Sequence, residues 1–317
     1  MTGRGRQGAA RTGSLFAGAA AVARSLPSLR GRGRMALALH RRAPRFDTSW
    51  DVEMRAGHRM TVPAGSAQTW RAAFTGAYDD EELELLLPHV APGSFVLDVG
   101  ASLGFYAVPL GLAAGRAGGR VLAIEPVPAN CAVIRRNLAA NGLESVVDIV
   151  VVGLGAREES VLLHVETGGT GNATIVSGLD PGEVAGHDRA GGTGDVEMAQ
   201  VVRLDDLALP EAYDGLRCSL MKIDAEGFEM DALAGGTAFV TAHRPVIFAE
   251  FHPSWLATRG VAPAAPQAWA AANDYDVSEL VYTRAHPVLD RRRITLRPLT
   301  ARATRSGTSL LLVPRGG

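Results

Sequence analysis

The sequence predicts an α/β fold with a mostly parallel sheet, because short apolar runs alternate with helical segments along much of its 317 residues. Two of these runs end in an acidic residue, and the first leads into a glycine-containing turn. Apolar runs of this length are typical of strands buried on both faces. The expected strands are 95–99, 121–125, 147–152, 219–224 and 246–251, a closing hairpin of 276–282 and 308–313, and added edge strands 161–165 and 199–203.

The turn after the first strand is the most informative segment. Asp98 ends the apolar run, and Gly100 and Gly104 follow with three residues between them. Such a turn lies at the carboxyl end of a parallel strand, where ligands bind, and glycine lets the backbone approach a ligand closely. The spacing differs from the G-x-G-x-x-G pattern of dinucleotide sites. It therefore favours S-adenosylmethionine, which has no pyrophosphate; a turn that serves packing alone is the alternative.

Glu125 ends the second apolar run at a distance from Gly104 that suits a βαβ unit. A carboxylate in this position can accept hydrogen bonds from both ribose hydroxyls of a nucleoside. Pro126 stops the strand because it has no N–H for the ladder, and a helix is expected over 128–140. The alternative is an ordinary solvated strand end.

Five segments together resemble the FkbM-type methyltransferases, which are typically S-adenosylmethionine-dependent O-methyltransferases. They occur in the family's order over about residues 81–253 and read FVLDVGASLGFYAVPL, VLAIEPVPANCAVIRRNLAANGL, VVRLDDL, MKIDAEGFEMDALAGG and RPVIFAEFH. The resemblance implies a Rossmann-like methyltransferase fold, with a mostly parallel seven-stranded sheet and an antiparallel closing strand. Ser102 stands where the family commonly has Asn, and Ala225 where Val is common. The expected cofactor-binding residues are Asp98, Gly100, Ser102, Gly104 and Glu125.

Three regions are expected along the chain. Residues 1–46 contain many arginines and no acidic residue, which predicts a basic segment without fixed structure. Residues 47–94 are expected to form an N-terminal cap of short elements, with a helix over 80–89. Residues 95–317 are expected to form the methyltransferase domain. Within it, the glycine-rich stretch 167–195 is either a flexible insert or a lid.

Bulk properties narrow the class of partner. A formal net charge of -1 argues against a nucleic-acid partner for the whole chain. No apolar run approaches the length needed to span a membrane. Cys131 and Cys218 lie within expected elements and are interpreted as buried thiols in a reducing cytoplasm. The oligomeric state stays open.

Candidate catalytic residues lie where the fourth and fifth strands end. Methyl transfer requires an acceptor held in line with the methyl group, and a hydroxyl acceptor must lose its proton to a base. Asp224 and Glu226 follow the fourth strand, and Glu250 and His252 end the fifth. The alternatives are a helix cap for the first pair and a turn residue for His252. Mg²⁺ ligation by the acids is less favoured, because no third carboxylate or Asn is evident nearby.

The leading functional hypothesis is S-adenosylmethionine-dependent O-methylation of a hydroxyl on a small molecule or saccharide. An N-methyltransferase or a peptide methyltransferase on the same fold is the alternative. A nicotinamide oxidoreductase is disfavoured by the missing dinucleotide pattern. A non-catalytic nucleoside-binding module is disfavoured by the acidic positions. No Cys/His cluster has metal-ligand spacing, so no metal site is expected.

Overall fold

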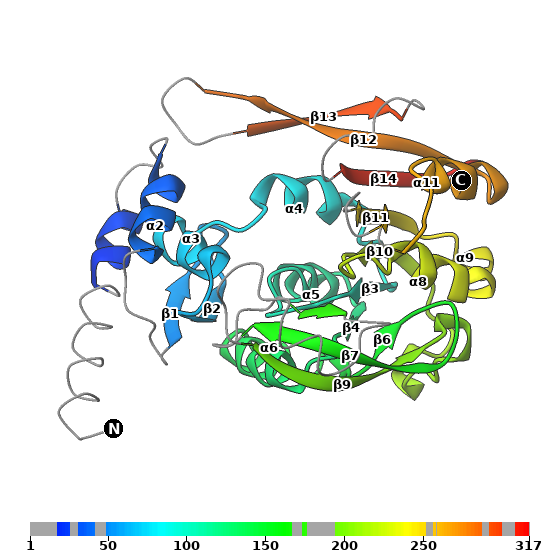
Figure 1. The fold of residues 1–317 in the computed structure, drawn as a ribbon, viewed down its shortest axis with the longest axis horizontal. Helices are drawn as coiled ribbons and strands as arrows, with labels where there is room; N and C mark the ends of the chain where they lie inside the picture. Colours follow the sequence, from blue (N-terminus) through cyan, green and yellow to red (C-terminus); the bar gives the residue numbers. More distant parts are fainter. Residues whose placement is uncertain are drawn as a thin grey trace.

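The fold is described from a computed structural model. It describes residues 18–25, 31–41, 49–166, 173–175, 194–251, 256–257, 259–286, 292–299 and 308–316. A central sheet runs through the molecule in the order β13-β12-β14-β11-β10-β3-β4-β5 (Figure 1). The strands β3 (Phe95–Val99), β4 (Arg120–Ile124), β5 (Val147–Val150), β10 (Cys218–Ile223) and β11 (Val246–Phe251) are parallel. The strands β14 (Thr308–Pro314), β12 (Tyr275–Arg284) and β13 (Arg292–Pro298) complete the sheet in antiparallel pairing.

The α/β class and the mostly parallel sheet are confirmed, but the strand count is not. The described sheet has eight strands rather than seven, because residues 292–298 form an additional strand that was not expected. Nearly every residue of β13 is exposed. A solvent-facing edge strand can carry charged residues that a buried strand cannot, so it lacks the apolar pattern by which the other strands were found.

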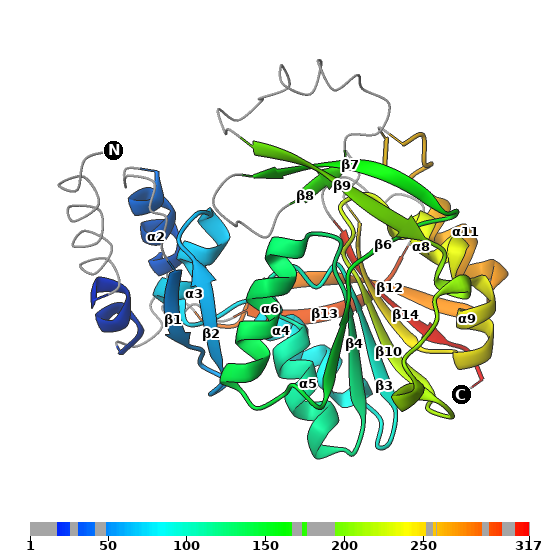
Figure 2. The ribbon, with the colours of Figure 1, turned by 90° about the horizontal axis from the view of Figure 1, so that it is seen from below.

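Helices cover both faces of the central sheet (Figure 2). On one face α4 (Asp80–Leu86), α5 (Ala107–Arg116) and α6 (Pro128–Ala140) share a core with Val96. On the other, α8 (Glu229–Gly235), α9 (Thr237–His243) and α11 (Ala265–Ala272) share a core with Leu97. Successive side chains of a strand point to opposite faces, so one apolar run supplies both cores. The expected helix 128–140 is confirmed.

A second sheet lies across the carboxyl ends of the central strands (Figure 2). It consists of β6 (Gly153–Leu154), β7 (Glu159–Glu166), β8 (Ala173–Ile175) and β9 (Gly194–Val202), in the order β6-β9-β7-β8. The strands expected at 161–165 and 199–203 exist, but they pair with each other and do not extend the central sheet. They share a small core with Val127 of the connection after β4, and this core includes Val161, Leu163 and Val201. Most of the expected insert 167–195 lies outside the described residues.

The N-terminal cap contains a hairpin and a helix, neither of which was predicted individually. These are β1 (Ser49–Glu53), β2 (Arg59–Pro63) and α3 (Ala67–Thr75). The segment 1–46, expected to be without fixed structure, differs in its described part: residues 18–25 are helical, and α2 (Arg32–His40) packs on α3. Ala20 and Ala36 are buried there, because small side chains allow helices to pack closely.

Asn137 of α6 ties the cap to the glycine turn. Its side-chain oxygen accepts a hydrogen bond from Thr61 N at 2.6 Å, and its amide donates to Leu103 O at 2.9 Å. The cap is therefore fixed against the loop at the end of β3. Cys131 and Cys218 are both buried and unpaired, as expected. Among the described helices, none combines the length and apolarity that a membrane crossing requires.

Candidate active site

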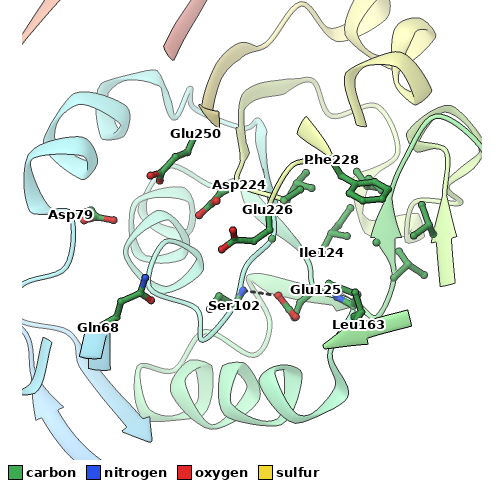
Figure 3. Close-up of a pocket in the computed structure, with 18 of the residues that line it drawn as sticks. Gln68, Asp79, Ser102, Ile124, Glu125, Leu163, Asp224, Glu226, Phe228 and Glu250 are labelled. Atoms are coloured by element: carbon green, nitrogen blue, oxygen red, sulfur yellow. Dashed lines mark hydrogen bonds between the residues drawn. The ribbon is translucent and has the colours of Figure 1, made fainter. Parts of the chain in front are cut away.

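A cavity of about 270 Å³ opens at the carboxyl ends of β3, β4, β10 and β11 (Figure 3). Three parts of the fold line it: the central strand ends, the second sheet, and the N-terminal cap. Of the expected site residues, Gly100, Ser102, Glu125, Asp224, Glu226 and Glu250 line the cavity. Asp98 and Gly104 do not line it, and His252 lies outside the described residues.

The glycines of the turn are required by the backbone. Gly100 has φ of +74°, and a Cβ there would meet Asp224 O at 1.9 Å. Gly104 has φ of +86° with only ordinary contacts around its Cβ position, the nearest at 3.6 Å. At Gly100 the chain that leaves β10 therefore already requires a glycine, and the expected close approach to a ligand stays a prediction. Ser102 has φ of +52°, a conformation in which Asn is enriched among non-glycine residues, which accounts for the Asn commonly found at this position.

Glu125 lies at the end of β4 with its carboxylate held by hydrogen bonds. Ser102 N donates to Oε2 at 2.8 Å, while Val127 N and the Asn130 side chain donate to Oε1 at 3.0 and 3.1 Å. The residue is only 4% exposed. Burial raises the pKa of Glu125 to about 7, although the three donors act in the opposite direction. The carboxylate is thus rigidly placed beside the turn.

Asp98 lies beneath the turn and not in the cavity. Its side chain is fully buried and pairs with Lys222 of β10 at 3.3 Å. The Lys222 ammonium also donates to Gly100 O at 2.8 Å. Direct contact between Asp98 and a cofactor is therefore not supported by its position. Instead, the buried pair holds the glycine turn from below.

The loop after β10 carries Asp224 and Glu226 into the cavity (Figure 3). Helix α8 begins only at Glu229, with Phe228 as its N-cap residue. The carboxylate of Glu229, rather than either expected acid, accepts hydrogen bonds from the loop amides of Ala225 and Gly227 at 3.1 and 2.9 Å. The helix-cap alternative for Asp224 and Glu226 is therefore wrong, and both residues line the cavity.

The cavity has two chemically different ends. The apolar end adjoins Glu125 and is lined by Ile124, Leu154, Leu163, Val201 and Phe228. The polar end is lined by Gln68, Arg71, Asp79, Asp224, Glu226 and Glu250. Sequence reasoning missed the contributions of the cap and of the second sheet, because each reaches the cavity only through tertiary packing. Asp79 precedes an acidic helix start, and that pattern alone indicates a cap.

Mg²⁺ ligation by the acids stays the less favoured alternative. Within the described ranges, no group of three or more His, Cys, Asp or Glu side chains is placed to hold a metal ion. The acids of the polar end come from the start of α4 (Asp79), the loop after β10 (Asp224 and Glu226) and β11 (Glu250) (Figure 3). The chemistry open to them is hydrogen bonding to an acceptor and proton transfer.

Residues 98–276, more than half of the chain, match the methyltransferase FkbM domain. The protein therefore belongs to the FkbM methyltransferase family, as the sequence motifs indicated. The matched range includes the glycine turn, Glu125, and the loop after β10.

Two fungal proteins are similar to part of the chain. Methyltransferase sdnD of Sordaria araneosa is 29% identical over 157 residues, which cover 44% of this chain and 60% of that protein. Methyltransferase 1 of Beauveria bassiana (strain ARSEF 2860) is 30% identical over 149 residues, which cover 45% of this chain and 58% of that protein. The chain thus spans less than two thirds of the length of these relatives.

Solved methyltransferase structures resemble the fold more distantly. Methyltransferase FkbM from Methylobacillus flagellatus KT aligns over 69% of this chain and 43% of its own, with 17% identity and a TM-score of 0.38. A SAM-dependent O-methyltransferase from Thermotoga maritima aligns over 83% of this chain and 77% of its own, with 14% identity and a TM-score of 0.35.

Proposed function

We propose that the protein transfers the methyl group of S-adenosylmethionine to a hydroxyl group of a small molecule or saccharide. The observation that carries the proposal is the division of one cavity into an apolar end beside a buried carboxylate and a polar end rich in acids. The first end suits a nucleoside, and the second suits an acceptor whose proton must be removed. S-adenosylmethionine would supply an electrophilic methyl group between them.

The apolar end fits the adenosine part of the cofactor. Glu125 is held in place by Ser102 N and Val127 N, and carboxylate oxygens carry further lone pairs that can accept from ribose hydroxyls. The side chains of Ile124 and Phe228 provide apolar surface for a flat base. Gly100 and Ser102 line the same cavity and would contact the cofactor through their backbone.

The polar end fits a neutral, hydroxyl-rich acceptor. Among the residues that the structure describes, four carboxylates line it, those of Asp79, Asp224, Glu226 and Glu250, together with one guanidinium, that of Arg71. An anionic acceptor would be repelled by this excess of negative charge. Carboxylates accept hydrogen bonds from hydroxyls and can take up the proton released during transfer.

Cofactor binding is tested by calorimetry with S-adenosylmethionine. Glu125→Ala should weaken binding by about 1–3 kcal/mol, the value of lost charge-assisted hydrogen bonds. Glu144→Ala is the matched control, because Glu144 is an exposed carboxylate on the connection from α6 to β5, at the opposite end of the sheet. Equal affinity of wild type and Glu125→Ala would contradict the assignment of this carboxylate to the ribose.

Transfer is tested with a cell extract and trideuteromethyl-labelled cofactor. Mass spectrometry should find a labelled small molecule or saccharide, and NMR of the product should place the methyl group on oxygen. A methyl group on nitrogen would support the N-methyltransferase alternative. Binding without any labelled product would support the non-catalytic module. Loss of activity with chelator, restored by Mg²⁺, would add a metal to the mechanism.

A further inference from the structure

Asp79 occupies the N-cap position of α4 but does not act as a cap. N-cap aspartates normally accept a hydrogen bond from the second or third amide of the helix, which stabilises the helix. The side chain of Asp79 accepts no such bond, although every residue of α4 is described. Its backbone has φ of +48°, a conformation that is unfavourable for most side chains. The Asp79 carboxylate therefore does not cap α4 and has other contacts instead.

The carboxylate of Asp79 lines the polar end of the cavity, on the opposite side from Asp224 and Glu250 (Figure 3). Its Oδ2 accepts a hydrogen bond from the Tyr106 hydroxyl at 3.4 Å. The neighbouring Tyr78 stacks on Phe105 with ring centroids 3.9 Å apart. Two contacts from the segment at the start of α5 therefore fix the position of this part of the cap.

Tyr106 connects Asp79 to the cofactor turn. The Lys222 ammonium lies 5.1 Å from the centre of the Tyr106 ring, within the range of a cation–π contact. The same ammonium donates to Gly100 O. A continuous set of contacts thus runs from the glycine turn through Lys222 and Tyr106 to Asp79, and it places the carboxylate relative to the turn.

We propose that Asp79 is the general base that accepts the proton of the acceptor hydroxyl; this inference rests on the proposed function. The hydroxyl oxygen forms a bond to the methyl carbon as the carbon–sulfur bond breaks, and that electron pair goes to sulfur to give S-adenosylhomocysteine. The hydroxyl proton passes to the Asp79 carboxylate, which becomes a neutral carboxyl group. Release of this proton to water restores the base.

The surroundings of Asp79 suit this role better than those of Asp224. Burial, followed by the charge of Glu82, raises the pKa of Asp79 to about 7, with a smaller contribution from Asp224; Arg71 and the Tyr106 hydroxyl act in the opposite direction. A base with a pKa near the working pH is the most effective. Asp224, by contrast, lies 3.8 Å from the buried ammonium of Lys222, which partly neutralises its charge.

The test compares Asp79→Asn with wild type, using S-adenosylhomocysteine formation in the same cell extract. The amide is isosteric and tolerates positive φ, so the variant should fold, but it cannot accept a proton. Its rate should fall about 100-fold or more, while the affinity for S-adenosylmethionine measured by calorimetry stays within about threefold of wild type. Glu84→Gln, at an exposed acid on the same helix, should leave both values unchanged.

Two pH measurements separate a base from a residue with a structural role. The wild-type rate should rise through about pH 7 as the carboxylate ionises. In Tyr106→Phe this rise should move to higher pH, because the hydroxyl that lowers the pKa of Asp79 is gone. In the protein without cofactor, the folded state holds the Asp79 proton more tightly than the unfolded state. As pH rises from about 4 to 7, the melting temperature of wild type should therefore fall relative to that of Asp79→Asn.

The outcomes are distinct. An Asp79→Asn variant that keeps a third or more of the wild-type rate would overturn the inference and leave the proposed function intact. A loss of rate accompanied by loss of cofactor affinity would assign Asp79 a structural role and also overturn it. A wild-type protein that binds the cofactor and methylates nothing would overturn the proposed function itself, and the inference with it.

Discussion

Replacement of Gly100 by alanine should be among the most damaging single changes at the cavity. The new Cβ would lie 1.9 Å from Asp224 O, and φ of +74° already disfavours a side chain. The conformational cost alone is about 1–2 kcal/mol. Relief of an overlap with packed atoms typically adds about 1–3 kcal/mol. The two contributions sum to about 2–5 kcal/mol of unfolding free energy. A main-chain oxygen cannot rotate away as a side chain can, so we expect a loss in the upper part of this range, roughly 4–5 kcal/mol.

Gly104→Ala is the matched control, because Gly104 belongs to the same turn. It has φ of +86°, but the nearest atoms to its Cβ position are side-chain carbons of Ile134 at 3.6 Å. This variant should lose only the conformational part, about 1–2 kcal/mol. The difference in unfolding free energy between the two variants therefore measures the cost of the overlap between the Gly100 Cβ and the chain after β10.

The assay is urea denaturation followed by far-UV circular dichroism, with the unfolding free energy and the slope m fitted for each variant. Equal losses for the two alanine variants would refute the close approach of Gly100 to Asp224. If Gly100→Ala is too unstable to titrate, its soluble yield and melting temperature beside those of Gly104→Ala give the same comparison.

Two further predictions concern buried carboxylates. Asp98→Asn should cost up to about 3–5 kcal/mol of unfolding free energy, because it removes the nearer and fully buried charge partner of the Lys222 ammonium and leaves only Asp224, at 3.8 Å. Thermal denaturation checks this, and a loss below about 1 kcal/mol would contradict it. Burial raises the pKa of Glu229 to about 7 from 4.5, so the folded state binds this proton more tightly than the unfolded state, and unfolding free energy falls as pH rises from about 4.5 to 7. Glu229→Gln should remove this pH dependence and raise the unfolding free energy above that of wild type by up to roughly 3 kcal/mol at pH 8. Its amide oxygen still accepts hydrogen bonds from the amides of Ala225 and Gly227. Parallel curves of unfolding free energy against pH for the two proteins would rule out this role of Glu229.

The buried strands and the cofactor turn could be predicted from the sequence because their signals are local. A strand covered on both faces must be apolar throughout, which is why β3, β4 and β10 were found. The strand β13 was missed because an exposed edge strand needs no apolar residues. The strands of the second sheet were wrongly expected at the edge of the central sheet. A short strand of ordinary pattern does not specify its partner, so only tertiary packing determines which strands pair.

The carboxylates of the site likewise separate what the sequence predicts from what only the tertiary structure determines. The sequence by itself determined that Glu125, Asp224 and Glu250 would meet at one edge of the sheet, since parallel strands end together there. Tertiary structure alone decided which way each acid points. Asp98 lies beneath the loop and pairs with Lys222 of a neighbouring strand. Asp79, at the N-cap of α4, faces the cavity because of its positive φ and its hydrogen bond from the hydroxyl of Tyr106, the N-cap residue of α5. A strand-end or helix-start pattern locates the backbone, whereas the direction of a side chain depends on contacts with residues distant in sequence.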